Sequence, residues 1–264
     1  MADSPEAITE AYIYAVTVSG SQQIAWKQDG GGAEDRSVTV AVLAALTMTV
    51  GNVAALRQRA DRDRSAVRLL AWSSVAQAGY LLVPIAAAAY SSDEQIGSTV
   101  AYALMYAVVN LGAFAVAALV SRTHPGNRVD DYRGLYATRP LAALALGFFL
   151  LCLAGLPPGI IGLFAKVTVF SAAVDAGLGW LAVVMAVNVV IALYYYLQWT
   201  AILFRSPESP ENAETGGGAP ASGTPRRFPV PAPLTTAIAL TAVVGILLSG
   251  APQLVLRFAA VNLF

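Results

Sequence analysis

Apolar residues in this chain are gathered into long runs, and polar residues are concentrated between them. Five of the runs have the length of about 20 residues that an α-helix needs to cross a bilayer core. A further apolar stretch, 141–174, is longer than one span requires. The pattern predicts an all-α integral membrane protein with about six transmembrane helices. The five runs are 38–56, 69–90, 96–120, 180–204 and 233–248.

The stretch 141–174 carries a helix-breaking sequence near its middle, formed by Pro157, Pro158 and Gly159. Proline lacks a backbone N–H, and its ring clashes with the preceding helical turn. Inside a membrane, the backbone groups freed by a break must face protein or a water-lined cavity. We therefore predict one transmembrane helix that is broken at Pro157 and Pro158.

The segments between the runs alternate in charge, which predicts an orientation. Segments 57–68, 121–140 and 205–230 contain most of the arginines, whereas the intervening loops contain acidic residues and no basic ones. The positive-inside rule places the arginine-rich loops in the cytoplasm and both termini on the outer side. Residues 206–226 are rich in Ser, Pro, Gly and Ala, which predicts a flexible cytoplasmic loop. The polar segment 1–37 is left unassigned.

Composition supports a membrane protein and narrows the chemistry. The chain is 57% hydrophobic and only 12% charged, whereas soluble domains are about 25% charged. A formal net charge of zero gives no basis for a nucleic-acid partner. The one cysteine, Cys152, and the one histidine, His124, are too few for a disulfide within the chain or for a metal or haem site built by this chain alone.

Lys166 is the exception among the 16 Lys and Arg residues, because the others all lie outside the apolar runs. A lysine at the centre of a transmembrane helix costs about 2.5–3.5 kcal/mol on insertion scales. Burial also disfavours the charged form of a lysine, so that the amine exchanges protons more readily. One interpretation is a side chain that snorkels to the membrane interface near Asp175. The other is a proton relay, because broken helices line ion pathways in transporters.

Two polar groups accompany Lys166 in neighbouring runs. Tyr102, Tyr106 and Asn110 recur at positions i, i+4 and i+8 and therefore share one helix face. Either hydrogen bonding between helices or a hydrated path beside Lys166 explains such a face. The same two interpretations apply to the second group, in the run 69–90, which consists of Ser73, Ser74 and Gln77.

Three sequence motifs resemble those of a known family. Residues 68–80, RLLAWSSVAQAGY, resemble the signature KRLLAYSSIAHAGY of the antiporter-like subunits of respiratory complex I. Residues 156–166, LPPGIIGLFAK, look like the broken-helix motif GIPPTAGFFGKF of these subunits. Residues 187–197, VNVVIALYYYL, are similar to the element VNSVISAYYYL of the N subunit of NADH-quinone oxidoreductase. The motifs occur in the family's order.

This resemblance implies a fold and a role for particular residues. Residues 38–264 would form a transmembrane proton-channel-like domain, equivalent to the second antiporter-like repeat and a final helix. Lys166 matches the lysine of the broken helix and would be the proton relay. Pathway support would come from the polar side chains of two neighbouring helices, namely Tyr102, Tyr106, Asn110, Ser74 and Gln77.

The resemblance also implies location and partners. The chain would lie in a bacterial plasma membrane with other membrane subunits of complex I, and would bind no redox cofactor itself. NADH, FMN, iron–sulfur clusters and quinone would belong to partner subunits.

Two alternatives remain open, because the chain matches only about the last six of the family's roughly fourteen helices. One is a truncated structural remnant without transport. The other is a subunit of a multisubunit sodium/proton antiporter, although the apolar runs contain no carboxylate for sodium.

Overall fold

A computed structural model describes residues 32–60, 65–88, 90, 95–206 and 232–251. The described part is helical and contains no β-strand, apart from one isolated bridge between Ser65 and Arg128. The elements are α2 (Gly32–Ala60), α3 (Ala66–Ala87), α4 (Gln95–Ser121), the 3₁₀-helix η2 (Val129–Tyr132), α5 (Leu135–Thr138), α6 (Pro140–Ala154), α7 (Ile160–Asp175), α8 (Gly179–Leu203) and α9 (Ala232–Gly250).

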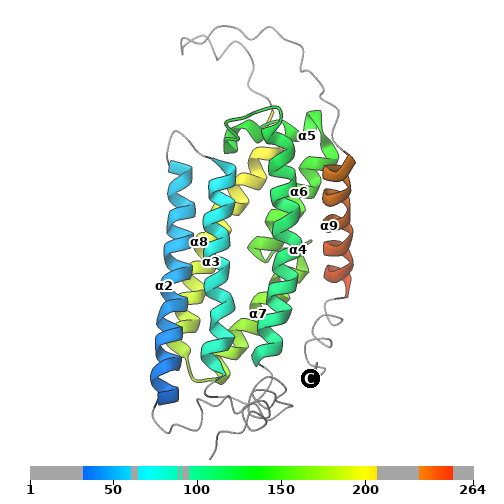
Figure 1. Ribbon diagram of the computed structural model, residues 1–264. Helices are drawn as coiled ribbons and strands as arrows, with labels where there is room; N and C mark the ends of the chain where they lie inside the picture. Colours follow the sequence, from blue (N-terminus) through cyan, green and yellow to red (C-terminus); the bar gives the residue numbers. More distant parts are fainter. Residues whose placement is uncertain (1–31, 61–64, 89, 91–94, 207–231, 252–264) are drawn as a thin grey trace, which may run out of the picture.

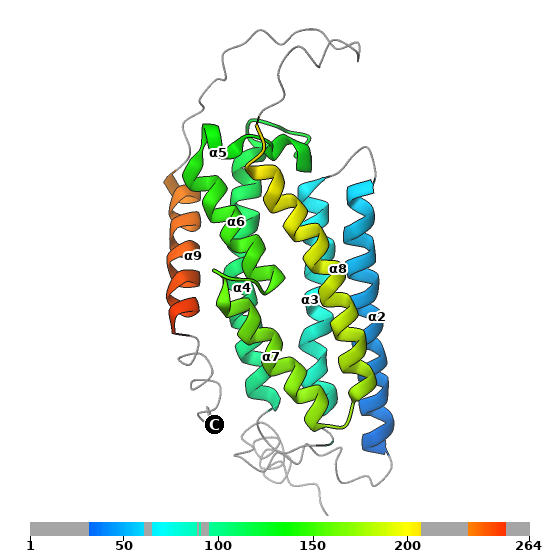
Figure 2. The same cartoon turned by 180° about the vertical axis from the view of Figure 1, so that it is seen from behind.

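The predicted all-α membrane fold is confirmed. Helices α2, α3, α4, α8 and α9 are long and apolar enough to cross a membrane. The shorter α6 and α7 follow one another along the height of the bundle (Figure 2), where the sixth, broken span was predicted. Helix α2 begins at Gly32, before the predicted start at Val38. Of the predicted flexible loop 206–226, all but Ser206 lies outside the described residues, as does segment 1–31.

The helices form three groups across the bundle. Figure 1 shows α2, α3 and α8 together on one side, α4, α6 and α7 in the middle, and α9 at the opposite edge.

Two glycines allow α2 and α3 to approach closely. A Cβ atom added to Gly51 would lie 2.4 Å from the amide nitrogen of Ala76, and one added to Gly79 would lie 2.6 Å from that of Met48. Small residues permit such backbone contact between membrane helices.

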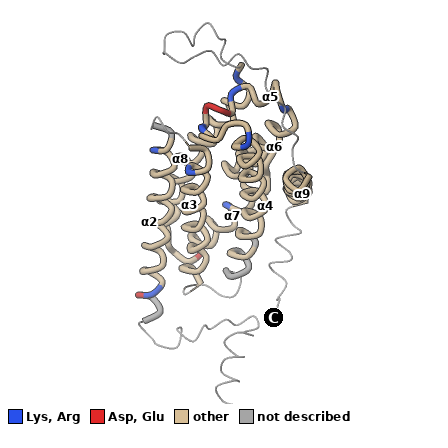
Figure 3. Tube along the Cα trace, turned by 45° about the horizontal axis from the view of Figure 1, so that its top comes forward, with Lys and Arg blue, Asp and Glu red and all other residues tan. Residues whose placement is uncertain are grey.

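The described arginines of the arginine-rich segments lie at one end of the bundle. Figure 3 shows basic residues spread along this end, from where α2 ends and α3 begins to α5. At this end, hydrogen bonds to Asn127 connect the start of α3 with η2. The backbone carbonyl of Asn127 accepts from the backbone N–H of Ala66 at 2.8 Å, and its Oδ1 accepts from the Tyr132 hydroxyl at 2.7 Å. Burial raises the pKa of the Tyr132 hydroxyl above its ordinary value. The common end agrees with the predicted alternation of loops, whereas the side of the membrane it faces stays a prediction.

Candidate functional site

The site begins at the interruption between α6 and α7. Helix α6 ends at Ala154, and Gly155 follows with φ +84°, a left-handed conformation that glycine adopts without strain. The amides of Gly155 and Leu156 both donate to the carbonyl of Leu151 at 2.9 Å. The rest of the link to α7 contains the residues expected to break the helix, Pro157, Pro158 and Gly159.

Two glycines bring the start of α7 against the end of α6. A Cβ atom added to Gly162 would lie 1.7 Å from the carbonyl oxygen of Cys152, and one added to Gly159 would lie 2.4 Å from its Sγ. With α6 and α7 in these positions, neither residue 159 nor residue 162 has room for a side chain. The first turn of α7 therefore lies beside the last turn of α6. Lys166, one turn beyond Gly162, is thereby brought within reach of the carbonyl groups that end α6.

Lys166 binds the carboxyl end of α6. Its Nζ donates to the carbonyl oxygens of Leu153 at 2.8 Å and Ala154 at 2.7 Å. The last carbonyls of a helix have no partner within the helix and carry partial negative charge. Only 6% of the Lys166 residue is exposed. The side chain therefore points into the bundle, and the interpretation that it snorkels towards Asp175 is wrong.

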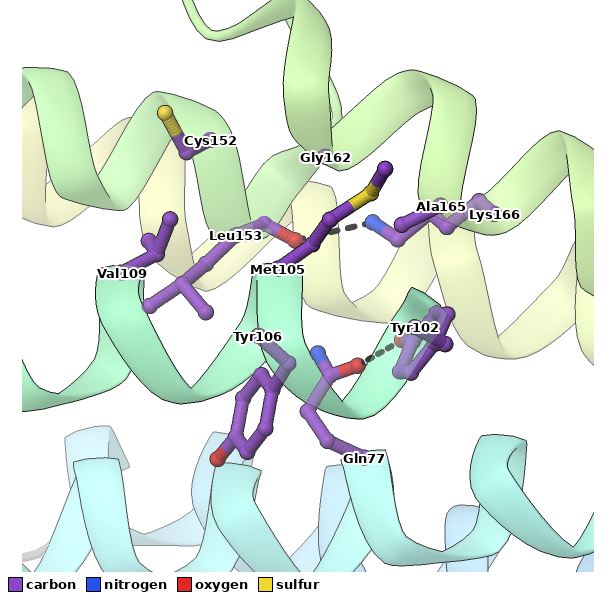
Figure 4. Close-up of a pocket in the computed structure, with 10 residues that line it drawn as sticks. All are labelled: Gln77, Tyr102, Met105, Tyr106, Val109, Cys152, Leu153, Gly162, Ala165 and Lys166. Carbon is purple, nitrogen blue, oxygen red and sulfur yellow. Dashed lines mark hydrogen bonds between the residues drawn. The ribbon is translucent and has the colours of Figure 1, made fainter. Parts of the chain in front are cut away.

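A small cavity lies beside Lys166 (Figure 4), and three of the polar residues singled out in the sequence line it with the lysine: Gln77 from α3, and Tyr102 and Tyr106 from α4. Its volume is about 20 Å³, and a cavity of about 10–15 Å³ or more has room for one water molecule. The other lining residues are Met105, Val109, Cys152, Leu153, Gly162 and Ala165.

The polar faces of α3 and α4 meet as a continuous strip. Tyr102 donates its hydroxyl hydrogen to Oε1 of Gln77. Two turns along α4, Nδ2 of Asn110 donates to Oγ of Ser74 at 3.2 Å. Asn110 and Ser74 do not line the cavity but extend the strip away from it. Between the two pairs, the Tyr106 hydroxyl is buried without a hydrogen bond.

Ser73 does not join this strip. Its hydroxyl donates to the carbonyl of Leu70 within its own helix, at 2.7 Å. Such bonds satisfy a serine inside an apolar helix without a partner from another helix. Ser74 makes the same bond to Leu70, at 2.8 Å, while also accepting from Asn110. The two serines share this acceptor, and Ser74 alone also bonds to α4 through Asn110.

A second polar cluster escaped the sequence analysis. Nδ2 of Asn52 donates to Oδ1 of Asn188 at 3.0 Å, and the Tyr195 hydroxyl donates to Oδ1 of Asn52 at 2.9 Å. Nδ2 of Asn188 also donates to Oγ1 of Thr49 at 3.1 Å. These bonds join α2 to α8. An asparagine inside an apolar run was the available signal, because a buried amide needs partners.

Comparisons with known proteins identify a family and several proteins of similar sequence. Residues 32–192 match the family described as NADH:quinone oxidoreductase/Mrp antiporter, TM. The chain is 85% identical over 226 residues to NADH-quinone oxidoreductase subunit N 2 of Streptomyces griseus, covering 85% of this chain and 42% of that protein. It is 47% identical over 180 residues to NADH-quinone oxidoreductase subunit N of Salinispora tropica, covering 65% of this chain and 34% of that protein. The chain thus spans less than half the length of these curated relatives.

Solved structures share the fold. One chain of respiratory complex I from Thermus thermophilus with bound aureothin matches with a TM-score of 0.62 and 31% identity, over 83% of this chain and 44% of that chain. A chain of the Mrp complex from Dietzia sp. matches with a TM-score of 0.72 and 23% identity, over 97% of this chain and 50% of that chain. At 23% identity the second match shows the fold alone.

Proposed function

The chain belongs to the NADH:quinone oxidoreductase/Mrp antiporter transmembrane family, and we propose that it is a membrane-arm subunit of a proton-translocating NADH:quinone oxidoreductase. The relative at 85% identity carries the name of subunit N of that enzyme. A complex I chain is also more similar in sequence than the Mrp chain, at 31% against 23% identity. The sodium/proton antiporter is therefore the second candidate.

The observation that carries this function is the position of Lys166 between two carbonyl groups and a cavity. An ammonium group has three N–H bonds, and a neutral amine has two and a lone pair. Two hydrogens bind the carbonyls of Leu153 and Ala154 in either state. The remaining position holds a proton or a lone pair beside the cavity. Lys166 thus gains or loses a proton without giving up its bonds to α6, as a relay requires.

The polar strip of α3 and α4 provides the neighbouring steps. A water molecule in the cavity would lie between Lys166 and the hydrogen-bonded pair of Tyr102 and Gln77. Hydroxyl groups both donate and accept, so they pass a proton along a hydrogen-bonded chain. The Tyr106 hydroxyl, buried without a hydrogen bond, lies between this pair and the pair of Asn110 and Ser74. We assign these side chains the role of supporting a water path.

Partner subunits would supply the redox chemistry. NADH oxidation, with FMN and iron–sulfur clusters, and quinone reduction would occur in other subunits of the complex. This chain would contact further membrane subunits and the bilayer. Changes in charge at neighbouring sites of the membrane arm would act on Lys166 electrostatically, because a buried charge is weakly screened. The arginine-rich end of the bundle would face the cytoplasm.

Two substitutions of Lys166 test the relay in the assembled complex. Lys166→Arg keeps a cation and hydrogen-bond donors but holds its proton at all physiological pH values. Lys166→Met removes both the donors and the charge. We expect both variants to lower the number of protons translocated per NADH in inverted membrane vesicles. Thr168→Ala, on the same helix, removes a hydroxyl that bonds within α7 to the Ala165 carbonyl and serves as the matched control.

The outcomes separate the proposals. Full proton stoichiometry in an assembled Lys166→Arg complex would reject the relay. A chain that never copurifies with NADH-oxidising subunits would be a remnant or part of another assembly, which its length, less than half that of its relatives, leaves open. Proton movement that depends on external sodium and not on NADH would favour the antiporter.

A further inference from the structure

A groove lies between α2 and Trp72 of α3, and it shares no lining residue with the Lys166 cavity. Its volume is about 350 Å³, within the range of about 300–1,000 Å³ typical of ligand sites. Trp72 of α3 forms one wall. The α2 residues that line it recur in adjacent pairs at every turn: Thr49, Val50, Val53, Ala54, Arg57 and Gln58.

These pairs form a stripe that changes in polarity along the helix. Val50, Val53 and Ala54 are apolar, and Arg57 and Gln58 follow at the arginine-rich end of the bundle. At 1.5 Å per residue the stripe from Thr49 to Gln58 is about 13 Å long. Its charged end therefore lies near the membrane surface, and its apolar part lies in the hydrocarbon region of a bilayer crossed by α2.

The charge of this end favours an anionic ligand. Segment 57–68 contains five arginines and two aspartates. Basic pockets between membrane helices bind anionic lipid head groups, and the guanidinium group binds phosphate oxygens in pairs. Trp72, with 37% of its surface exposed, lies in the groove near this end. Indole side chains commonly lie at the level of lipid head groups.

We propose that the groove between α2 and Trp72 binds one anionic phospholipid, with its phosphate at Arg57 and Gln58 and an acyl chain along Val53 and Val50. Arg57 at one end of the stripe complements a phosphate group, and the apolar residues Val53 and Val50 complement an acyl chain. The site is independent of the proton relay. Arg57 and Lys166 lie on different helices, and the two cavities have no lining residue in common.

Tryptophan fluorescence tests the proposal directly. The full chain would be reconstituted in phosphatidylcholine vesicles containing an equal small fraction of dibrominated phosphatidylglycerol or dibrominated phosphatidylcholine. Bromine quenches indole fluorescence at short range, and comparison with Trp72→Phe isolates the Trp72 signal. We expect about a fivefold preference for the anionic lipid, because one arginine near the surface contributes about 1 kcal/mol.

Two arginine variants form a matched pair. Arg57→Gln should reduce the preference to nearly one, and Arg205→Gln, an exposed arginine beyond the end of α8, should retain it. Native mass spectrometry checks the result without the tryptophan substitution. It counts the phosphatidylglycerol and phosphatidylcholine molecules retained by the unmodified chain, Arg57→Gln and Arg205→Gln. Equal quenching by both lipids, an unchanged preference in Arg57→Gln, or a Trp72 signal that neither lipid quenches would overturn the proposal. The last outcome would mean that another polypeptide segment covers the groove.

Discussion

The carbonyl oxygen of Cys152 occupies the space that a side chain on Gly162 would need. The distance from an ideal Cβ atom to this oxygen is 1.7 Å, less than half of an ordinary contact. The obstacle is backbone, which rotation of a side chain does not relieve. The position of α7 against α6, and with it the reach of Lys166 to the α6 carbonyls, therefore depends on a hydrogen atom at residue 162.

Gly162→Ala should destabilise the bundle and displace Lys166. Overpacking of a filled interior costs about 1–3 kcal/mol, and a backbone clash lies at the upper end of that range. The unfolding midpoint in detergent should fall. Gly179→Ala is the control, because a Cβ atom there meets nothing within 4 Å and alanine favours the helix. Equal midpoints for the two variants would contradict the close packing described for Gly162.

Tyr102→Phe should slow proton translocation while preserving assembly. The substitution keeps the ring but removes the hydroxyl that donates to Gln77. Loss of one buried hydrogen bond, at about 1 kcal/mol, corresponds to a rate about fivefold lower. The measurement is NADH-driven acidification of inverted vesicles at matched complex content. Tyr136→Phe, at an exposed tyrosine of α5, should leave the rate unchanged. Equal rates for Tyr102→Phe and the unmodified chain would exclude the Tyr102 hydroxyl from the path.

Asn52 and Asn188 should be coupled energetically. Each amide uses the other as a partner, so either alanine substitution alone removes their shared bond, and the second removes only the bonds that its residue makes to other groups. Hydrogen bonds between membrane helices contribute about 0.6–1.7 kcal/mol. A double-mutant cycle on unfolding in mixed micelles should give a coupling energy in this range. Additive effects of the two substitutions would show that the pair does not fasten α2 to α8.

Tyr132→Phe should destabilise the arginine-rich end by about 1–2 kcal/mol, because it leaves Oδ1 of Asn127 without its donor. The difference should depend on pH. Burial raises the pKa of Tyr132 in the folded chain above the ordinary value of 10.0, so its stabilising contribution is present below pH 10 and falls as the pH rises above it. Unfolding midpoints of both chains at pH 8 and above pH 10 measure this. A difference that stays constant or grows would contradict the assigned burial.

The sequence predicted the positions of the helices more completely than the contacts of the candidate site. Long apolar runs suffice to locate membrane helices, and the proline pair located the interruption, because both follow from local chemistry. The spacing of Tyr102 and Tyr106 predicted a shared face, and the structure brings both beside Lys166.

Long-range contacts were beyond the sequence. Asn52 and Asn188 are 136 residues apart, and their pairing follows from how α2 and α8 pack. The direction of the Lys166 side chain likewise depends on the contact of Gly162 with Cys152. The sequence favoured burial through the proline break, but local spacing did not exclude snorkelling. Only the fold of α7 against α6 decides between them.

In the proposed relay, the small volume beside Lys166 would protect an electrochemical gradient from leakage. A cavity of about 20 Å³ is filled by one water molecule, whereas uncontrolled back-flow requires a continuous file of water. Met105, Val109 and Leu153 surround the cavity with apolar atoms. In the proposed relay, this conformation would insulate the membrane, and conduction would need a rearrangement that admits more water. An enzyme that drove this rearrangement with redox energy would open the path only while electron transfer supplied that energy.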